Sequence, residues 1–288
     1  MHKFESLGFI YSELPAPAWG WSDSQLHNWL KGVELWKSKK SRDPELIKYL
    51  QHAFKDGFSL IFDKEPPPPH KPIPNNKSCI NQAGDTLDRQ EFLKKKIDAL
   101  EAGNKIREIP QEEAHWVQPL HIVMAEGKEP RLVYDCSREG VGTNYYLKKV
   151  TFTMQSIDDA IRISSPCCWY NKWDIEACFL SFSIHKDFQK YLQFSILEKY
   201  YCFTHLIFGL TCAPFNNDCA MQILCCVCES LEIDLAQYVD DYLEASTSEE
   251  RAKITSLVFT KVLMSLGLVN KDKKMISSSR NRISRYSD

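Results

Sequence analysis

The order of periodic segments from Trp169 onward constrains the fold more than any other feature of this chain. Ignoring strands inserted between Asp174 and Gly209, the pattern reads strand, helix, strand, strand, helix, strand. These segments span residues 167–184, 213–229, 235–246, 249–267 and 268–276. This order is that of a split βαβ unit. The sequence therefore predicts an α+β fold in which the first strand and the central hairpin are neighbours.

Composition divides the chain into four predicted segments. Two helical patterns, 22–36 and 42–58, mark a helical region. The run DKEPPPPHKPIPNNKS follows, and its prolines lack amide donors and favour an extended form, which is typical of a linker. A helix at 86–104 and two strands around a turn at 126–128 come next. The predicted segments are a helical region at 1–64, a linker at 65–84, a third segment at 85–165 and the split βαβ unit at 166–288.

Charge and cysteine content limit which partners and which cellular compartment the sequence can predict. The 36 Lys and Arg nearly balance the 38 Asp and Glu, so nucleic-acid binding would need local basic patches. The N-terminus lacks a charged and then apolar signal segment, which favours reduced thiols and an intracellular location, in nucleus or cytoplasm. Cys225, Cys226 and Cys228 lack zinc-site spacing and are expected to be buried thiols. No apolar run has the length of a membrane span, so no membrane partner is expected.

The stretch LAQYVDDYLEAS places Asp240 and Asp241 side by side between apolar residues. A surface turn is the alternative explanation for such a pair. In the split βαβ plan, however, Asp174 on the first strand comes close to both. Two unit charges about 4 Å apart repel by on the order of 4 kcal/mol at intermediate dielectric, so three carboxylates need a cation. Oxygen-only ligands suit Mg²⁺, and the pattern predicts a pair of divalent ions of the kind used for displacement at phosphorus.

Five stretches together resemble reverse transcriptases, the RNA-directed DNA polymerases. They occur in the order of that family over about residues 95–276. They are PRLVYDCS, KWDIEACFLSFSI, FGLTCAPF, QYVDDYLEAS and LGLVNKDKKM. Further stretches resemble retrotransposons of the tyrosine-recombinase (DIRS-like) type, with gypsy-like and other retroelement enzymes as alternatives. These are PELIKYLQHAFKDGF, GVGTNYYLKKVTFTMQSIDDAI and SIHKDFQKYLQF.

The resemblance implies a domain organisation and a reaction. Residues 85–165 would be fingers, and 166–288 a palm with a ferredoxin-like sheet and finger strands inserted at about 183–208. The enzyme would add deoxynucleoside monophosphate to a primer 3′ hydroxyl on an RNA or DNA template, using two Mg²⁺ ions, or Mn²⁺ in their place. The thumb is expected to be absent, so that a partner domain could supply a thumb or RNase H.

Catalytic and metal-binding roles follow from the same resemblance. Asp174 and Asp240 would bind both metal ions, Asp241 would be the third carboxylate, and the backbone carbonyl of Ile175 would complete a site. Phe179 falls where the family has an aromatic ring that excludes a 2′ hydroxyl, which implies deoxynucleoside triphosphates as substrates. The other substrate-binding residues implied are Arg131, Lys128, Phe208, Gly209, Tyr238 and Lys273.

The chain also departs from the family pattern. Met124, Ala125 and Glu126 replace the usual lysines, and Ile207 replaces proline. Asn217 stands where an aromatic residue is usual, and Cys178 where alanine is. With no thumb-like segment after Met275, a fragment or a decayed copy is expected. A non-catalytic remnant that binds nucleic acid or protein is one alternative, and a viral RNA-dependent RNA polymerase, disfavoured by Phe179, is the other.

Overall fold

The computed structural model divides the chain into two compact units. The hairpin unit comprises residues 1–51, 152–178 and 217–288, and the second unit comprises 52–151 and 179–216. The structure describes residues 1–13, 16–17, 20–39, 43–66, 87–123, 127, 130–140, 142–165, 168–196 and 198–277. For residues 87 and 272–277 it describes the backbone alone. Most of the predicted linker, 65–84, therefore lies outside the described residues, and the four predicted segment boundaries stay predictions.

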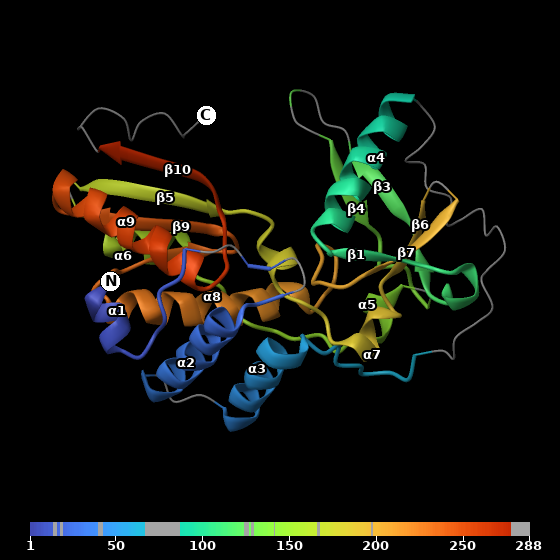
Figure 1. Cartoon of the computed structure of the whole chain (residues 1–288), viewed down its shortest axis with the longest axis horizontal. Helices are drawn as coiled ribbons and strands as arrows, with labels where there is room; N and C mark the ends of the chain where they lie inside the picture. The colour runs from blue at the N-terminus through green and yellow to red at the C-terminus, as the bar shows by residue number, and fades with distance from the viewer. Residues whose placement is uncertain are drawn as a thin grey trace. The chain divides into compact units, whose positions relative to one another are not determined.

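The hairpin unit contains a four-stranded antiparallel sheet in the order β10-β5-β9-β8 (Figure 1). Its strands are β5 (Trp169–Ile175), β8 (Ala236–Tyr238), β9 (Asp241–Ser246) and β10 (Asn270–Ser277). The first strand, β5, thus lies beside the second strand of the hairpin, β9, as the split βαβ plan predicts. The predicted α+β class is confirmed, whereas the assignment to fingers and palm stays a prediction.

Side-chain alternation gives this sheet one covered face and one open face. On β5, Asn171, Trp173 and Ile175 are buried, while Lys172 between them is exposed. The alternation continues on β9, where Tyr242 is buried. Helix α9 (Glu249–Ser265) covers the apolar face, since the ring of Phe259 lies 4.4 Å from that of Trp173 and 5.6 Å from that of Tyr242. Because the period of a strand is two, these buried residues leave the alternate side chains on the open face.

Local signals fix the ends of the helices around the sheet. Helix α6 (Ile157–Ile163) begins with a capping box, in which the Ser156 hydroxyl accepts from the Asp158 N–H and the Asp159 carboxylate accepts from the Ser156 N–H at 2.8 Å. Ser248 caps α9 by accepting from the Arg251 N–H. Helix α8 (Ala213–Ser230) is buried over most of its surface, including Cys226 and Cys228, while Cys225 is half-buried. Among the described residues, the cysteines form no disulfide.

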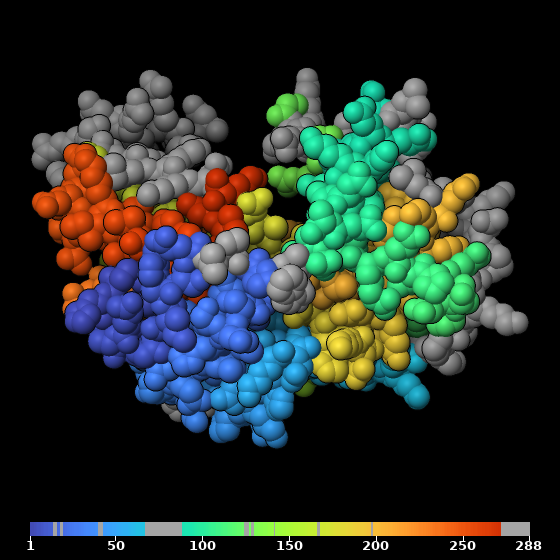
Figure 2. Space-filling model, viewed as in Figure 1, coloured from blue at the N-terminus to red at the C-terminus, as the bar shows by residue number. Residues whose placement is uncertain are grey.

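The N-terminal helices belong to the hairpin unit. They are α1 (His2–Ser6) and α2 (Asp23–Lys39). The indole N–H of Trp29 donates to the Leu266 carbonyl (3.0 Å), just beyond α9, and α2 lies against α9 (Figure 2). A Cβ at Gly32 would lie 2.6 Å from Cγ2 of Ile223, so glycine is what allows α2 to approach α8 so closely. The predicted pair of N-terminal helices is confirmed, with α3 (Pro44–Asp56) as its second member.

The second unit contains two small sheets around an aromatic core. One sheet has the order β1-β7-β6-β2, with β2 parallel to β6, and the other pairs β3 with β4. Rings of Phe54, Phe58 and Phe182 pack edge to face at 5.7 to 6.4 Å. The strands are β1 (Ile106–Ile109), β2 (Val117–Gln118), β3 (Leu120–Val123), β4 (Arg131–Tyr134), β6 (Gln193–Ile196) and β7 (Lys199–Phe203). The helices are α4 (Leu87–Ala102), α5 (Thr143–Tyr146) and α7 (Lys186–Gln189). Within the described ranges, no helix combines the length and apolar character required to cross a membrane.

A buried histidine in the second unit makes its stability depend on pH. The Thr204 hydroxyl donates its proton to the Asn104 carbonyl (2.6 Å), so Nδ1 of His205 carries a hydrogen and donates to that hydroxyl oxygen at 2.8 Å. Burial, with a smaller effect of Lys105, lowers the pKa of His205 to about 3. Between this pKa and the unfolded value near 6.5, the unfolded chain binds the proton and the folded chain does not. Stability therefore falls as the pH falls through this window.

We expect the free energy of unfolding to fall by about 2 kcal/mol between pH 7 and pH 5 through His205 alone. Urea unfolding at both pH values measures this drop. The His205→Asn variant should lack this part of the pH dependence, whereas the exposed-site control His52→Asn should retain it. Equal pH slopes for the wild type and His205→Asn would contradict the assignment.

Candidate active site

The sheet of the hairpin unit brings three aspartates to one end of two strands. Asp174 on β5 pairs directly with Asp241 on β9, and residues paired in this way project to the same face. Asp240 precedes Asp241 in the turn, and its backbone carbonyl accepts from the Ile175 N–H at 3.0 Å. All three aspartates are half-buried. Residues remote in the sequence are thus gathered at one end of the two central strands.

The turn between β8 and β9 is held in a sparsely populated conformation. Val239 has φ 57°, and a β-branched residue in the left-handed region costs on the order of 1–3 kcal/mol. Val239 directly precedes Asp240 in the turn, and Tyr238, paired with Asp241, has 58% of its surface exposed. Backbone strain of this kind persists only where surrounding contacts fix it.

The charges at this edge are only partly balanced. Partial burial raises the pKa of Asp240, and the neighbouring carboxylates of Asp174 and Asp241 raise it further. Lys172 opposes this effect, and its Nζ lies 3.0 Å from Oδ1 of Asp241. Lys172 is paired with Leu243 on β9, two residues after Asp241. The contact between Lys172 and Asp241 is therefore a diagonal one between neighbouring strands on the open face. The cluster therefore carries an excess of negative charge.

The donor set at this edge fits a divalent cation by its chemistry. It offers carboxylate oxygens and the carbonyl at the end of β5, which are the hard ligands that Mg²⁺ and Mn²⁺ take. The pKa of Asp240 is raised mainly by partial burial and to a smaller extent by repulsion from Asp174 and Asp241, and a bound cation would offset both effects. Among the described residues, however, no group of three or more His, Cys, Asp or Glu side chains already converges closely enough to hold a metal ion.

Four predicted substrate-binding residues have described positions in the second unit. Phe179 is buried, and Phe208, with 59% of its surface exposed, packs edge-on against it with ring centroids 4.4 Å apart. Gly209 has φ 103°, and a Cβ there would lie 2.7 Å from the Tyr134 carbonyl oxygen. Arg131 is exposed at the start of β4. The structure therefore brings Phe179, Phe208 and Gly209 together, with Arg131 on a different element of the same unit.

Two predicted residues lack a described side chain. Lys128 lies outside the described residues, together with Met124, Ala125 and Glu126. Lys273 is described only as a backbone position on β10, opposite Trp173. Their roles stay predictions.

Three residues near these positions received no role in the sequence analysis. Lys172 contacts Asp241, as described above. The Asn144 side chain donates to the Gly209 carbonyl at 2.6 Å and accepts from the Thr211 N–H at 2.8 Å, so it holds the loop that bears Phe208. The Asn217 side chain donates to the Val239 carbonyl at 3.3 Å. In the sequence, an asparagine near a glycine-containing loop only weakly indicates that its side chain bonds to the loop backbone. The contact of Lys172 with Asp241 could be predicted only from the register of the two strands.

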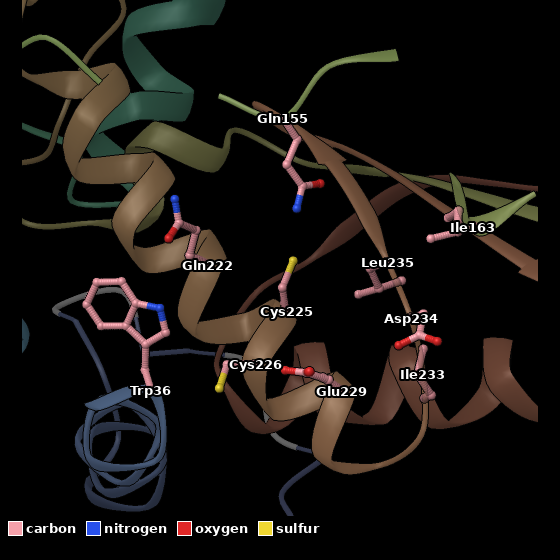
Figure 3. A pocket seen from close by; sticks show the side chains of 10 residues that line it. All are labelled: Trp36, Gln155, Ile163, Gln222, Cys225, Cys226, Glu229, Ile233, Asp234 and Leu235. Carbon is pink, nitrogen blue, oxygen red and sulfur yellow. The ribbon is translucent and has the colours of Figure 1, made fainter. Parts of the chain in front are cut away.

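Two cavities in the hairpin unit are lined by none of the predicted site residues. A cavity of about 380 Å³ opens along α8 between Trp36 and the segment that leads into β8 (Figure 3). It is lined by Trp36, Gln155, Ile163, Gln222, Cys225, Cys226, Glu229, Ile233, Asp234 and Leu235. A second cavity, of about 410 Å³, lies at the C-terminal end of α9. The aspartates instead lie at the ends of the two central strands, β5 and β9, and are half-buried.

The comparisons with known proteins point to one family. Residues 140–282 match the family model described as reverse transcriptase (RNA-dependent DNA polymerase). The match covers just under half of the chain, spans all four strands of the hairpin unit and includes all three aspartates. No curated protein matches the chain. The segment from residue 140 to residue 282 is thus similar to the reverse transcriptase family, and this supports a reverse transcriptase domain in the chain.

Proposed function

We propose that this chain is the RNA-directed DNA polymerase domain of a retroelement, of the tyrosine-recombinase (DIRS-like) type. It adds deoxynucleoside monophosphate to a primer 3′ hydroxyl and releases pyrophosphate. One observation carries the proposal. Asp174 lies opposite Asp241, beside Asp240, within the segment that matches the reverse transcriptase family.

The three carboxylates are the catalytic residues of this proposal. Asp174 and Asp240 would hold two Mg²⁺ ions, or Mn²⁺, with Asp241 and the Ile175 carbonyl as further ligands. Bound ions would supply charge neutralisation at the attacking and leaving oxygens. The protein's own contribution is the rigid pairing of β5 with β9, which fixes the spacing of the carboxylates before substrate arrives.

The substrate-binding residues follow from exposure and chemistry. Arg131 presents an exposed guanidinium, the group best suited to grip phosphate oxygens, and Lys128 and Lys273 would add positive charge near the triphosphate. The exposed ring of Phe208 on the buried ring of Phe179 offers an apolar surface for a nucleotide, and Gly209 allows backbone to approach it. The partners are a template with its primer and deoxynucleoside triphosphates.

The proposal is tested by primer extension. The purified chain is incubated with an RNA template, a labelled DNA primer, Mg²⁺ and either deoxynucleotides or ribonucleotides. We expect extension with deoxynucleotides only, and its loss when EDTA removes the metal. Extension by ribonucleotides at equal rate would point to an RNA-directed RNA polymerase, and the absence of extension would contradict the proposal.

One observation favours a second function, that of a non-catalytic remnant that binds nucleic acid. The ion pair between Lys172 and Asp241 gives one carboxylate a counter-charge without a metal. Both side chains are about half exposed, so the pair is worth little energy and a metal ion would displace it readily. Binding of a template–primer duplex without extension is the result that this second function predicts.

A further inference from the structure

A short chain of hydrogen bonds joins the interior of the hairpin unit to the strained turn. The Cys178 thiol donates to Oδ1 of Asn217 at 3.0 Å, and Nδ2 of Asn217 donates to the Val239 carbonyl at 3.3 Å. Cys178 and Asn217 are each 1% exposed. The two side chains therefore link the short 3-10 helix after β5 (Cys178–Ser181) and helix α8 to the residue before Asp240.

The chemistry of the three groups fixes the orientation of the Asn217 amide. A backbone carbonyl only accepts, so the side-chain atom facing Val239 must be the NH₂ group. This leaves Oδ1 toward Cys178, where it needs a donor. Burial raises the pKa of the Cys178 thiol, which keeps the proton that it donates. With the amide reversed, two oxygens would face each other, and the thiol would keep only the more distant Met221 sulfur, at 3.7 Å, as an acceptor.

This arrangement acts on the turn that carries Asp240. At φ 57°, Val239 holds a conformation that most residues avoid, and its carbonyl direction is set by the bond from Asn217. The next residue, Asp240, has its own carbonyl bonded to the Ile175 N–H on β5. Two successive carbonyls of the turn are thus fixed from two different elements.

We propose that Asn217, oriented by Cys178, is a positioning residue that holds the Val239 turn so that Asp240 and Asp241 keep their place opposite Asp174. This role rests on the proposed polymerase function of the same aspartates. It also gives a physical reason for two departures from the family pattern. The polar pair Cys178 and Asn217 replaces alanine and an aromatic ring, and the two changes are coupled through one hydrogen bond.

The first test is hydrogen exchange at the turn, which needs no catalytic activity. In Asn217→Ala the amides of residues 238–241 should exchange about tenfold faster, as expected for a lost hydrogen bond worth 1.4 kcal/mol. Cys178→Ser keeps a donor and should stay close to the wild type. Asn216→Ala, which removes the neighbouring buried asparagine of α8, serves as the matched control. Unchanged exchange in Asn217→Ala, or the same increase in Asn216→Ala, overturns the inference.

The second test is steady-state primer extension. Asn217→Ala should lower kcat about tenfold and leave the KM for deoxynucleotides unchanged, since the turn carries carboxylates rather than the nucleotide site. Cys178→Ala should lower kcat less, and the double variant should match Asn217→Ala, because the thiol acts only through Asn217. Additive losses in the double variant, or a raised KM alone, overturn the positioning role. If the wild-type chain extends no primer while exchange at the turn still responds, the polymerase proposal fails and the structural role of Asn217 stands.

Discussion

Asp240→Asn is expected to lower the rate of primer extension by at least about 10³-fold, because the carboxylate is proposed to hold both metal ions, whose charge stabilisation is worth several kcal/mol. The fold should survive the change. The pKa of Asp240 is raised by partial burial and by the carboxylates of Asp174 and Asp241, so a neutral amide of the same shape removes repulsion. The melting temperature should therefore be unchanged or slightly higher. Single-turnover extension and thermal melting measure the two quantities.

The matched control for Asp240→Asn is Asp234→Asn. Asp234 is an exposed aspartate shortly before β8 and has no part in the proposed site. Its amide variant should extend the primer as the wild type does. A loss below tenfold in Asp240→Asn, or equal losses in both variants, would mean that the carboxylate of Asp240 is not catalytic.

Phe179→Val is expected to raise the ratio of ribonucleotide to deoxynucleotide incorporation by about 10²-fold, the range of discrimination that a steric pocket achieves. The ring of Phe179 is 3% exposed and packs on the exposed ring of Phe208, so shortening it opens space at the proposed sugar position. The melting temperature should fall, since a smaller side chain leaves a cavity that costs up to about 3 kcal/mol. Parallel extension assays with each nucleotide type give the ratio.

Phe182→Val separates the cost of the cavity from the loss of selectivity. Phe182 is fully buried in the aromatic core of the same unit, where its ring packs on Phe54 and Phe58. This variant should lose stability to a similar extent and keep the nucleotide selectivity of the wild type. If both variants gained ribonucleotide incorporation equally, or if neither did, Phe179 would have no role in excluding the 2′ hydroxyl.

Local and periodic signals accounted for much of the fold. The sequence pattern predicts strands within 167–184 and 235–246 and helices at 213–229 and 249–267, and β5, β9, α8 and α9 are found there. The order of these elements predicts that Asp174 lies beside the hairpin, and the pairing of Asp174 with Asp241 confirms it. The sequence pattern does not predict strands β1 and β2, because they are four and two residues long, too short to show a clear alternation. Their existence depends on pairing with β7 and β6, from which they are distant in the sequence.

The finer structure of the site could not be read from the sequence. The contact of Lys172 with Asp241 depends on the register of β5 against β9. The apolar pattern determines which face each residue occupies, but a shift of two residues along the strand would keep that pattern. The bond from Asn217 to Val239 depends on how α8 lies against the turn, and the left-handed φ of Val239 is unusual for a β-branched residue. From the sequence, Cys178 and Asn217 were only two departures from the family pattern. Only the fold shows that these two residues, far apart in the sequence, are joined by a hydrogen bond.

The central claim is that Asp174 and Asp240 bind divalent metal ions where the central strands β5 and β9 meet the turn, and Mn²⁺ binding followed by electron paramagnetic resonance tests it most directly. Mn²⁺ is titrated into the wild type, the double variant Asp174→Asn with Asp240→Asn, and the control Asp234→Asn. We predict that the wild type and the control bind Mn²⁺ with the same affinity. The double variant should bind Mn²⁺ at least about tenfold more weakly, because it lacks two carboxylates that are proposed to coordinate the ion directly. Equal Mn²⁺ binding by all three proteins would contradict the account.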